Sequence, residues 1–180
     1  MNAHRLLPFA PLMTLLVWAA IEDLRTRRIR NWLTFSLICT GLLQSFIGHN
    51  GISPGVAGLG LLVGFALPLA LFALGALGGG DVKLLAGVGA WLGPVPVFEV
   101  FCTAAVIGLV IVLAQATAQG RLRTLSRNSA ILAINLVHVG DVGLEHASAT
   151  GKSCRSVDKP LPYAVPVLLA VTLLILGYLP

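Results

Sequence analysis

Long apolar runs separated by short polar segments constrain this chain more than any other feature. A helix needs about 20 mostly apolar residues to cross a bilayer, within a range of roughly 17–25. The runs are continuous rather than alternating, and lipid requires backbone groups to pair within their own segment, so we expect helices. The runs are Leu6–Ile21, Trp32–Gly48, Ile52–Leu77, Leu84–Phe98, Val100–Ala118 and Leu161–Leu179.

The fourth run is short and contains Gly93, Pro94 and Pro96. The fourth and fifth runs are therefore either two helices joined by a tight turn at Gly93–Pro94 or one long bent element. We favour two helices. The chain is then predicted to be an all-α membrane protein, a polytopic bundle of about six transmembrane helices, in a single domain covering 1–180.

Composition supports a membrane location, because only 11% of the residues are charged while 57% are hydrophobic. Soluble domains carry about 25% charged residues. The three isolated cysteines form no CxxC pair, and the four histidines have no ligand spacing. We therefore predict no metal site. Gly60 and Gly64 have the spacing that lets membrane helices approach closely, and we interpret them as packing residues.

The net charge of +5 is concentrated in a few loops. If both termini face outward, the inward loops are 23–31, 78–83 and 119–160, and they hold all the Lys and Arg residues except Arg5. Cytoplasmic loops are enriched in these residues, so this orientation is predicted. Within the cytoplasmic loop 119–160, the segment Ala130–Val139 is apolar but too short to span, and we expect it on the membrane surface. No basic run is interleaved with aromatic residues, so no nucleic-acid partner is predicted.

Two acidic residues are predicted to meet at the cytoplasmic edge of the membrane. Asp23 ends the first helix, and Asp81 lies between the third and fourth. The first and third helices run in the same direction in this topology, so both carboxylates lie at one face. Two close carboxylates share one proton. The charged one can take a proton from water while the protonated one hydrogen-bonds a scissile carbonyl. Glu22 points about 100° away from Asp23 on a helix, which places it outside the pair.

The residues around Asp81 have two interpretations. Gly78, Gly79 and Gly80 could take positive φ angles and let an extended substrate approach. Alternatively, they form an ordinary loop and Asp81 is the N-cap of the next helix. Lys83 could hold a substrate carbonyl or tune the carboxylate pair electrostatically, or it could be a flanking positive-inside lysine.

Three motifs, in order, resemble the type IV prepilin peptidases. The segment 23–31, Asp-Leu-Arg-Thr-Arg-Arg-Ile-Arg-Asn, resembles their first signature, an aspartate followed by basic residues and an Ile-Pro-Asn ending. The segment 78–84, Gly-Gly-Gly-Asp-Val-Lys-Leu, resembles the GxGD motif, and Pro162-Tyr163 is similar to the start of the last span in that family. One position departs from the pattern, because Arg30 stands where the family has proline. That change removes a rigid turn and puts the local loop geometry in question.

The resemblance implies an integral-membrane aspartic endopeptidase of the bacterial inner membrane with its active site facing the cytoplasm. Its substrates would be prepilins or pseudopilins, cut after a short basic leader. Asp23 and Asp81 would be catalytic, with Gly78, Gly80, Lys83 and Asn31 in supporting or substrate-binding positions. No cofactor is implied. The short chain is similar to the peptidase-only branch associated with Flp/Tad pili.

Two other functions stay open. One is a catalytically inactive scaffold or pilus-assembly factor, and the other is a small transporter with Asp23 and Asp81 as proton-relay acids. Transporters favour mid-membrane charges and matching broken helices, whereas these acids lie at one edge and no inverted repeat is visible. The sequence leaves open whether the two carboxylates are close together without substrate.

Overall fold

The computed structural model describes residues 7–48, 51–73, 77–120 and 162–177. These residues form one short 3-10 turn, η2 (Leu7–Phe9), and six α-helices, with no strand among them. The predicted all-α fold is confirmed for this part of the chain. The helices are α1 (Ala10–Thr26), α2 (Asn31–Ile47), α3 (Pro54–Ala73), α4 (Gly79–Leu92), α5 (Pro94–Ala118) and α9 (Ala164–Gly177).

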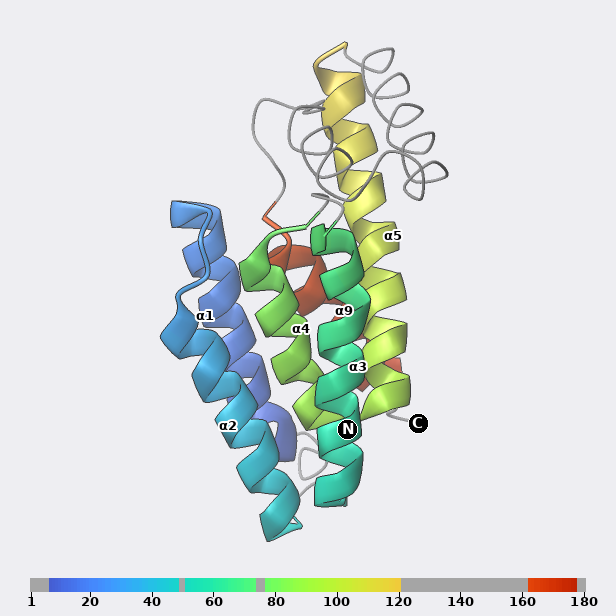
Figure 1. The fold of residues 1–180 in the computed structure, drawn as a ribbon. Coiled ribbons are helices and arrows are strands. Elements are labelled where there is room, and N and C mark those ends of the chain that lie inside the picture. Colours follow the sequence, from blue (N-terminus) through green and yellow to red (C-terminus); the bar gives the residue numbers. More distant parts are fainter. Residues whose placement is uncertain (1–6, 49–50, 74–76, 121–161, 178–180) are drawn as a thin grey trace.

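Successive helices of the bundle alternate in direction. In Figure 1, α1, α3 and α5 run toward the upper end of the bundle, and α2, α4 and α9 run back toward the lower end. The upper end therefore collects the C-terminal ends of α1 and α3 with the N-terminal ends of α4 and α9. This arrangement agrees with the prediction that Asp23 and Asp81 lie at the same end.

The central helix of the bundle is α4. Every residue from Leu84 to Leu92 is buried, and α4 contacts α2, α3, α5 and α9. A helix that is hydrophobic all round is found inside a protein core or in a membrane. The burial explains how α4 can be as short as 14 residues, or about 21 Å, because its neighbours cover it along its length.

Glycines allow α3 and α4 to pack with their backbones in contact. A Cβ atom on Gly60 would collide with the carbonyl oxygen of Gly89, and a Cβ on Gly89 would collide with that of Gly60. Gly64 lies one turn further along α3, against the carbonyl oxygen of Leu85. The interpretation of Gly60 and Gly64 as close-packing residues is confirmed.

The fourth and fifth apolar runs form two helices joined by a turn at Gly93–Pro94, as predicted. The chain turns at Gly93, whose φ of +86° favours glycine, and Pro94 begins α5 at a position where proline is well tolerated. The apolar runs had been divided at Glu99. That residue is exposed in the second turn of α5, because one charged side chain does not break a helix, whereas a glycine–proline pair does.

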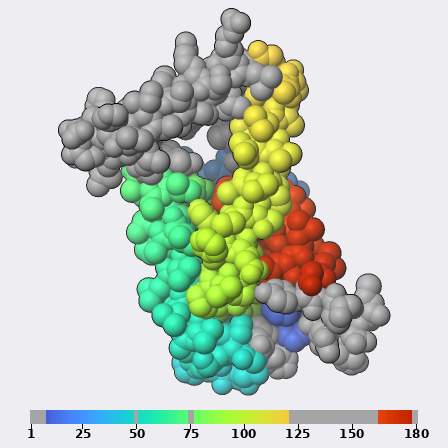
Figure 2. Space-filling view, turned by 90° about the vertical axis from the view of Figure 1, so that its right-hand side faces the viewer, coloured from blue at the N-terminus to red at the C-terminus, as the bar shows by residue number. Residues whose placement is uncertain are grey.

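Two helices, α3 and α5, are long and apolar enough to cross a membrane. The helices α2 and α9 are apolar but have only 17 and 14 residues, so the prediction that all six helices span the bilayer stays a prediction. Figure 2 shows α3, α5 and α9 side by side on one face, with the end of α5 projecting beyond the other two. The segment Ala130–Val139 and all but the first two residues of the loop 119–160 lie outside the described residues.

Candidate functional site

Asp23 lies in the last turn of α1 and is only 6% exposed, which makes it the single buried charged side chain among the described residues. Its Oδ2 atom accepts a hydrogen bond of 3.1 Å from the backbone N–H of Ala164. Ala164 is the first residue of α9, where N–H groups have no partner within the helix and the helix dipole is positive. The start of α9 therefore supplies a fixed donor to a carboxylate at the end of α1.

Asp81 is the third residue of α4, and Gly78 is the N-cap. The interpretation of Asp81 as the N-cap is therefore wrong, although its carboxylate does stabilise the helix start. Its Oδ2 atom accepts a 3.2 Å hydrogen bond from the N–H of Gly78. This is one half of a capping box. Gly78 has no side chain with which to form the other half.

The two carboxylates are close enough to influence each other. Burial raises the pKa of Asp81, and the nearby charge of Asp23 raises it further, from an ordinary value of 3.8 to about 7. Burial also raises the pKa of Asp23, but the Ala164 N–H and the charge of Arg27 lower it. The structure thus brings together the two predicted acids, and their surroundings favour the proton on Asp81.

The three glycines before Asp81 are not a loop with unusual backbone angles. Among the described glycines, positive φ occurs at Gly48, Gly51, Gly93 and Gly120, so the expectation of positive φ at Gly78, Gly79 and Gly80 is wrong. Gly79 and Gly80 form the first turn of α4, because the helix begins earlier than the apolar run starting at Leu84.

The glycine motif is explained by contacts rather than by backbone angles. A Cβ on Gly78 would lie 3.0 Å from Oδ2 of Asp81, and a Cβ on Gly80 would lie 3.3 Å from Cβ of Ile29. A Cβ on Gly79 would meet nothing nearer than Phe72, at an ordinary 3.6 Å. A side chain would therefore be crowded at the first and third positions and not at the second, which matches the spacing of a GxGD motif.

Lys83 and Asn31 are bound to each other. The Nζ atom of Lys83 donates a 2.9 Å hydrogen bond to Oδ1 of Asn31, the first residue of α2. Lys83 lies about 200° around the helix from Asp81, so the pair faces away from the carboxylates. Their hydrogen bond therefore links the start of α2 to the start of α4. A direct role for Lys83 on a substrate carbonyl has no support in this geometry.

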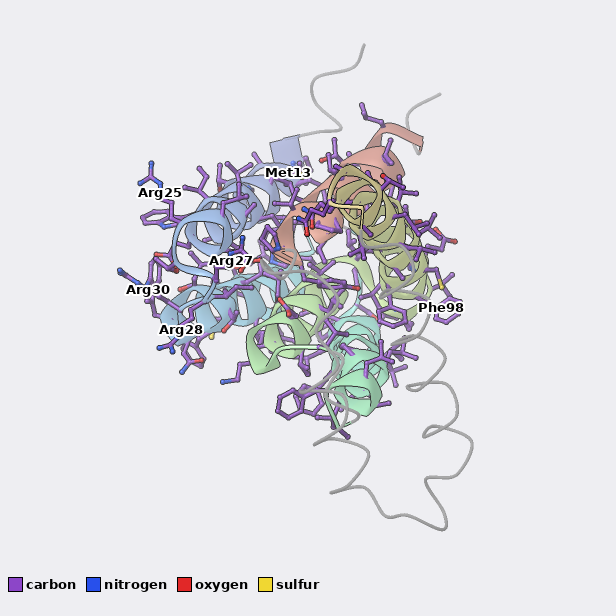
Figure 3. The ribbon with its side chains drawn as sticks, turned by 90° about the horizontal axis from the view of Figure 1, so that it is seen from above. Met13, Arg25, Arg27, Arg28, Arg30 and Phe98 are labelled. Carbon is purple, nitrogen blue, oxygen red and sulfur yellow. The ribbon has the colours of Figure 1, made fainter. Side chains whose placement is uncertain are left out.

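The segment joining α1 to α2 contributes charge to the site from one arginine only. Figure 3, viewed from the upper end, shows Arg27 on the side of α1 that faces the bundle, whereas Arg25, Arg28 and Arg30 lie on the outer side. Arg27 has a φ of +54° and caps α1 by donating its N–H to the carbonyl oxygen of Asp23 at 2.9 Å. This conformation places a positive charge next to the end of α1.

Arg30 preserves the local geometry that a proline would have. Its φ of −67° and ψ of 138° lie within the range fixed by a proline ring. Its Nε atom lies 3.4 Å from Oε1 of Glu22, whose side chain is mostly buried. The doubt about this loop is therefore resolved, and Glu22 pairs with Arg30 and not with Asp23, as its position on the helix predicts.

The start of α9 is the part of the site that sequence reasoning missed. Ala164 binds Asp23 through its backbone, and Tyr163 lies close enough to Asp81 to interact with it electrostatically. The Pro162-Tyr163 motif was the only signal available, and it had been interpreted as the start of a helix. Within the described ranges, no three His, Cys, Asp or Glu side chains come together in a way that could hold a metal ion.

Comparison with known proteins agrees with this geometry. The sequence model of the type IV leader peptidase family matches residues 10–113, more than half of the chain. The matched region runs from the start of α1 into α5, so it contains Asp23, Asp81 and the glycine motif and leaves out α9. Neither a curated protein nor a solved structure matches the chain. The family match establishes that this chain belongs to the type IV leader peptidase family.

Proposed function

We propose that the chain is a membrane aspartic endopeptidase that removes the basic leader peptide of type IV prepilins or pseudopilins. The observation that carries the proposal is the electrostatic coupling of Asp23 and Asp81, from two helices, at one end of the bundle. A leader peptidase needs such a pair, and the chain belongs to a family of leader peptidases. The membrane is the bacterial inner membrane, with all six helices spanning, both termini outward and the aspartates at the cytoplasmic face.

The surroundings of the two acids assign their roles. Asp23, which receives the Ala164 N–H and the charge of Arg27, is the ionised partner and takes a proton from the attacking water. Asp81, which holds its proton to about pH 7, donates a hydrogen bond to the scissile carbonyl oxygen. Water adds to the carbonyl carbon, and the carbonyl oxygen takes the proton of Asp81. The C–N bond then breaks as the amine leaves with the proton held by Asp23, and one hydroxyl of the tetrahedral intermediate returns its proton to Asp81 as the new carbonyl forms.

The remaining motif residues have supporting roles in this proposal. Gly78 leaves room for the Asp81 carboxylate, Gly80 allows Ile29 to approach, and the Lys83–Asn31 bond holds the starts of α4 and α2 together. None of these residues needs to touch the substrate. The short chain is assigned to the peptidase-only branch that serves Flp/Tad pili.

Leader removal is the direct test. The chain is produced together with a prepilin-like substrate, and the loss of the leader is followed by gel mobility. Asp23→Asn and Asp81→Asn should each lower processing by about 100-fold or more, because each removes one proton-transfer group. Glu99→Gln is the matched control, since it makes the same acid-to-amide change at an exposed position on α5.

The outcomes separate the competing functions. Processing that continues in both aspartate variants rules out the carboxylate pair as the catalyst. If the intact chain binds the substrate but leaves the leader in place, the inactive-scaffold function replaces the peptidase.

A further inference from the structure

The outer side of the α1–α2 hairpin carries a set of arginines that face away from the candidate site. Arg25, Arg28 and Arg30 are exposed and lie on the outer side of the hairpin in Figure 3. We call these three residues the arginine rim. Arg30 is paired with Glu22. Among the described residues, no ion pair accounts for the other two arginines of the rim, Arg25 and Arg28.

Two tryptophans lie directly below the arginine rim. The rings of Trp18 on α1 and Trp32 on α2 pack edge to face, with centroids 5.4 Å apart and an interplanar angle of 86°. They remain 52% and 45% exposed. Trp18 precedes Arg25 by two helical turns, which places the ring pair about 10 Å below the arginine.

Below the tryptophans, the large side chains exposed on α2 are apolar. Phe35, Leu43 and Phe46 on α2 are 67%, 60% and 74% exposed. From the upper end downward, the outer face therefore changes from cationic to amphipathic aromatic to mostly apolar. This is the order of environments in one leaflet of a bilayer, where phosphate groups lie above an interfacial layer that tryptophan prefers and acyl chains lie below.

We propose that the arginine rim and the Trp18–Trp32 pair form a binding surface for the headgroups of anionic phospholipids. The arginines match the negative charge of the lipid phosphates, and the tryptophans fix the depth at which the hairpin lies. Arg27, on the inner side, is not part of this surface, because its charge acts on Asp23. An acidic protein would explain the arginines, but it would leave the exposed apolar band continuous with them without a partner, which is why lipid is the occupant.

The surface can be tested by lipid quenching of tryptophan fluorescence. The full-length chain is placed in phosphatidylcholine vesicles that contain phosphatidylglycerol, with bromine on the acyl chains of one lipid or the other. The exposed pair reports contact, while Trp91, which is 2% exposed, gives a constant background. We expect brominated phosphatidylglycerol to quench more strongly than brominated phosphatidylcholine at equal content.

Paired variants identify the groups responsible. Arg25→Gln with Arg28→Gln should lower the preference for phosphatidylglycerol by on the order of fivefold per arginine removed. Arg25→Lys with Arg28→Lys keeps both charges and should keep the preference. Both positions are exposed, so the variants should fold, and the thermal unfolding midpoint checks that they do. Arg30 is left unchanged because it holds Glu22.

Three results would overturn the assignment. They are equal quenching by the two lipids in the unaltered chain, an unchanged preference in the double glutamine variant, and loss of the preference when inorganic phosphate replaces chloride at one ionic strength. The last result would assign the arginines to a free anion. The measurement needs no peptidase activity and can be made on Asp81→Asn, so its failure is separate from any failure of the proposed function.

Discussion

The end of α1 and the start of α4 each contribute one aspartate to the candidate site, but the two carboxyl groups have different electrostatic surroundings. Around Asp23, burial raises the pKa, but a helix N-terminus and an arginine both favour negative charge and partly offset it. Around Asp81, burial and the neighbouring carboxylate both oppose it, and only the Gly78 N–H favours it. The comparison shows how one protein can hold a charged and a neutral carboxyl side by side, because each acid has its own helix terminus and only one has a cation.

The largest effect of this difference should appear in the pH dependence of leader removal. The two acids titrate as a pair, and the pair must hold one proton. Since the pKa of Asp81 is about 7, the rate should fall about tenfold per pH unit above that value. The measurement is kcat/KM for a leader peptide from pH 4 to 9. A rate that stays flat to pH 9 would contradict the assignment of the proton to Asp81.

The raised pKa of Asp81 should also make the thermal stability of the protein depend on pH. This measurement needs no substrate, so it checks the pKa independently of the rate profile. Below pH 3.8 Asp81 is protonated in the folded and unfolded states alike. Between pH 3.8 and about 7 only the unfolded state ionises freely, so the folded state loses stability as pH rises. Asp81→Asn removes this loss and Asp23→Asn retains part of it. A change of about 1 kcal/mol moves the unfolding midpoint by about 2–4 °C.

A smaller effect should come from the glycines that surround Asp81. Gly80→Ala forces Ile29 to move by a few tenths of an ångström, and overpacking of this kind costs about 1–3 kcal/mol. We expect kcat/KM for the leader peptide to fall by about tenfold. Gly79→Ala is the matched control, because a methyl group there makes only an ordinary contact with Phe72. Equal losses in the two variants would show that helix flexibility, and not the approach of Ile29, explains the motif.

The smallest effect should come from Arg30→Pro, on the Asp23 side of the comparison. The backbone at residue 30 already has a proline-like φ, and the N-cap N–H is not used within the helix. Proline restricts the unfolded chain, which stabilises the folded state, whereas loss of the ion pair with Glu22 destabilises it. The two effects oppose each other, so the free energy of unfolding should change by less than about 1 kcal/mol. Denaturant unfolding measures it. A large loss would show that the Glu22–Arg30 pair holds the end of α1 in place.

The position of Asp23 and Asp81 at one end of the bundle could be predicted from sequence, because it depends on helix direction. Two helices, α2 and α3, lie between the end of α1 and the start of α4, so the chain returns to the same end before Asp81. The donor from Ala164 could not be predicted in this way, because every residue except proline carries a backbone N–H. Which of those groups meets a carboxylate is decided by packing between α1 and α9.

The glycine motif shows a second limit. Three consecutive glycines favour a flexible loop by composition, yet Gly79 and Gly80 are helical. The contacts that require glycine involve Ile29, which is distant in sequence, and the carboxylate of Asp81 itself. Similarly, arginine in place of the family's proline at position 30 put the local loop geometry in question, yet its backbone angles are those of a proline. The backbone angles at one residue depend on how the helices that it joins are placed, and the sequence motif alone does not predict that placement.

The bond between Asp23 and Ala164 joins residues 141 positions apart. Translation produces Asp23 early and Ala164 late, so for most of synthesis the first carboxylate is without its backbone donor. A nascent chain that lacks the last helix consequently has both acidic groups but no finished reaction centre. Under the proposed function, competence for cleavage would therefore depend on the last helix being in place.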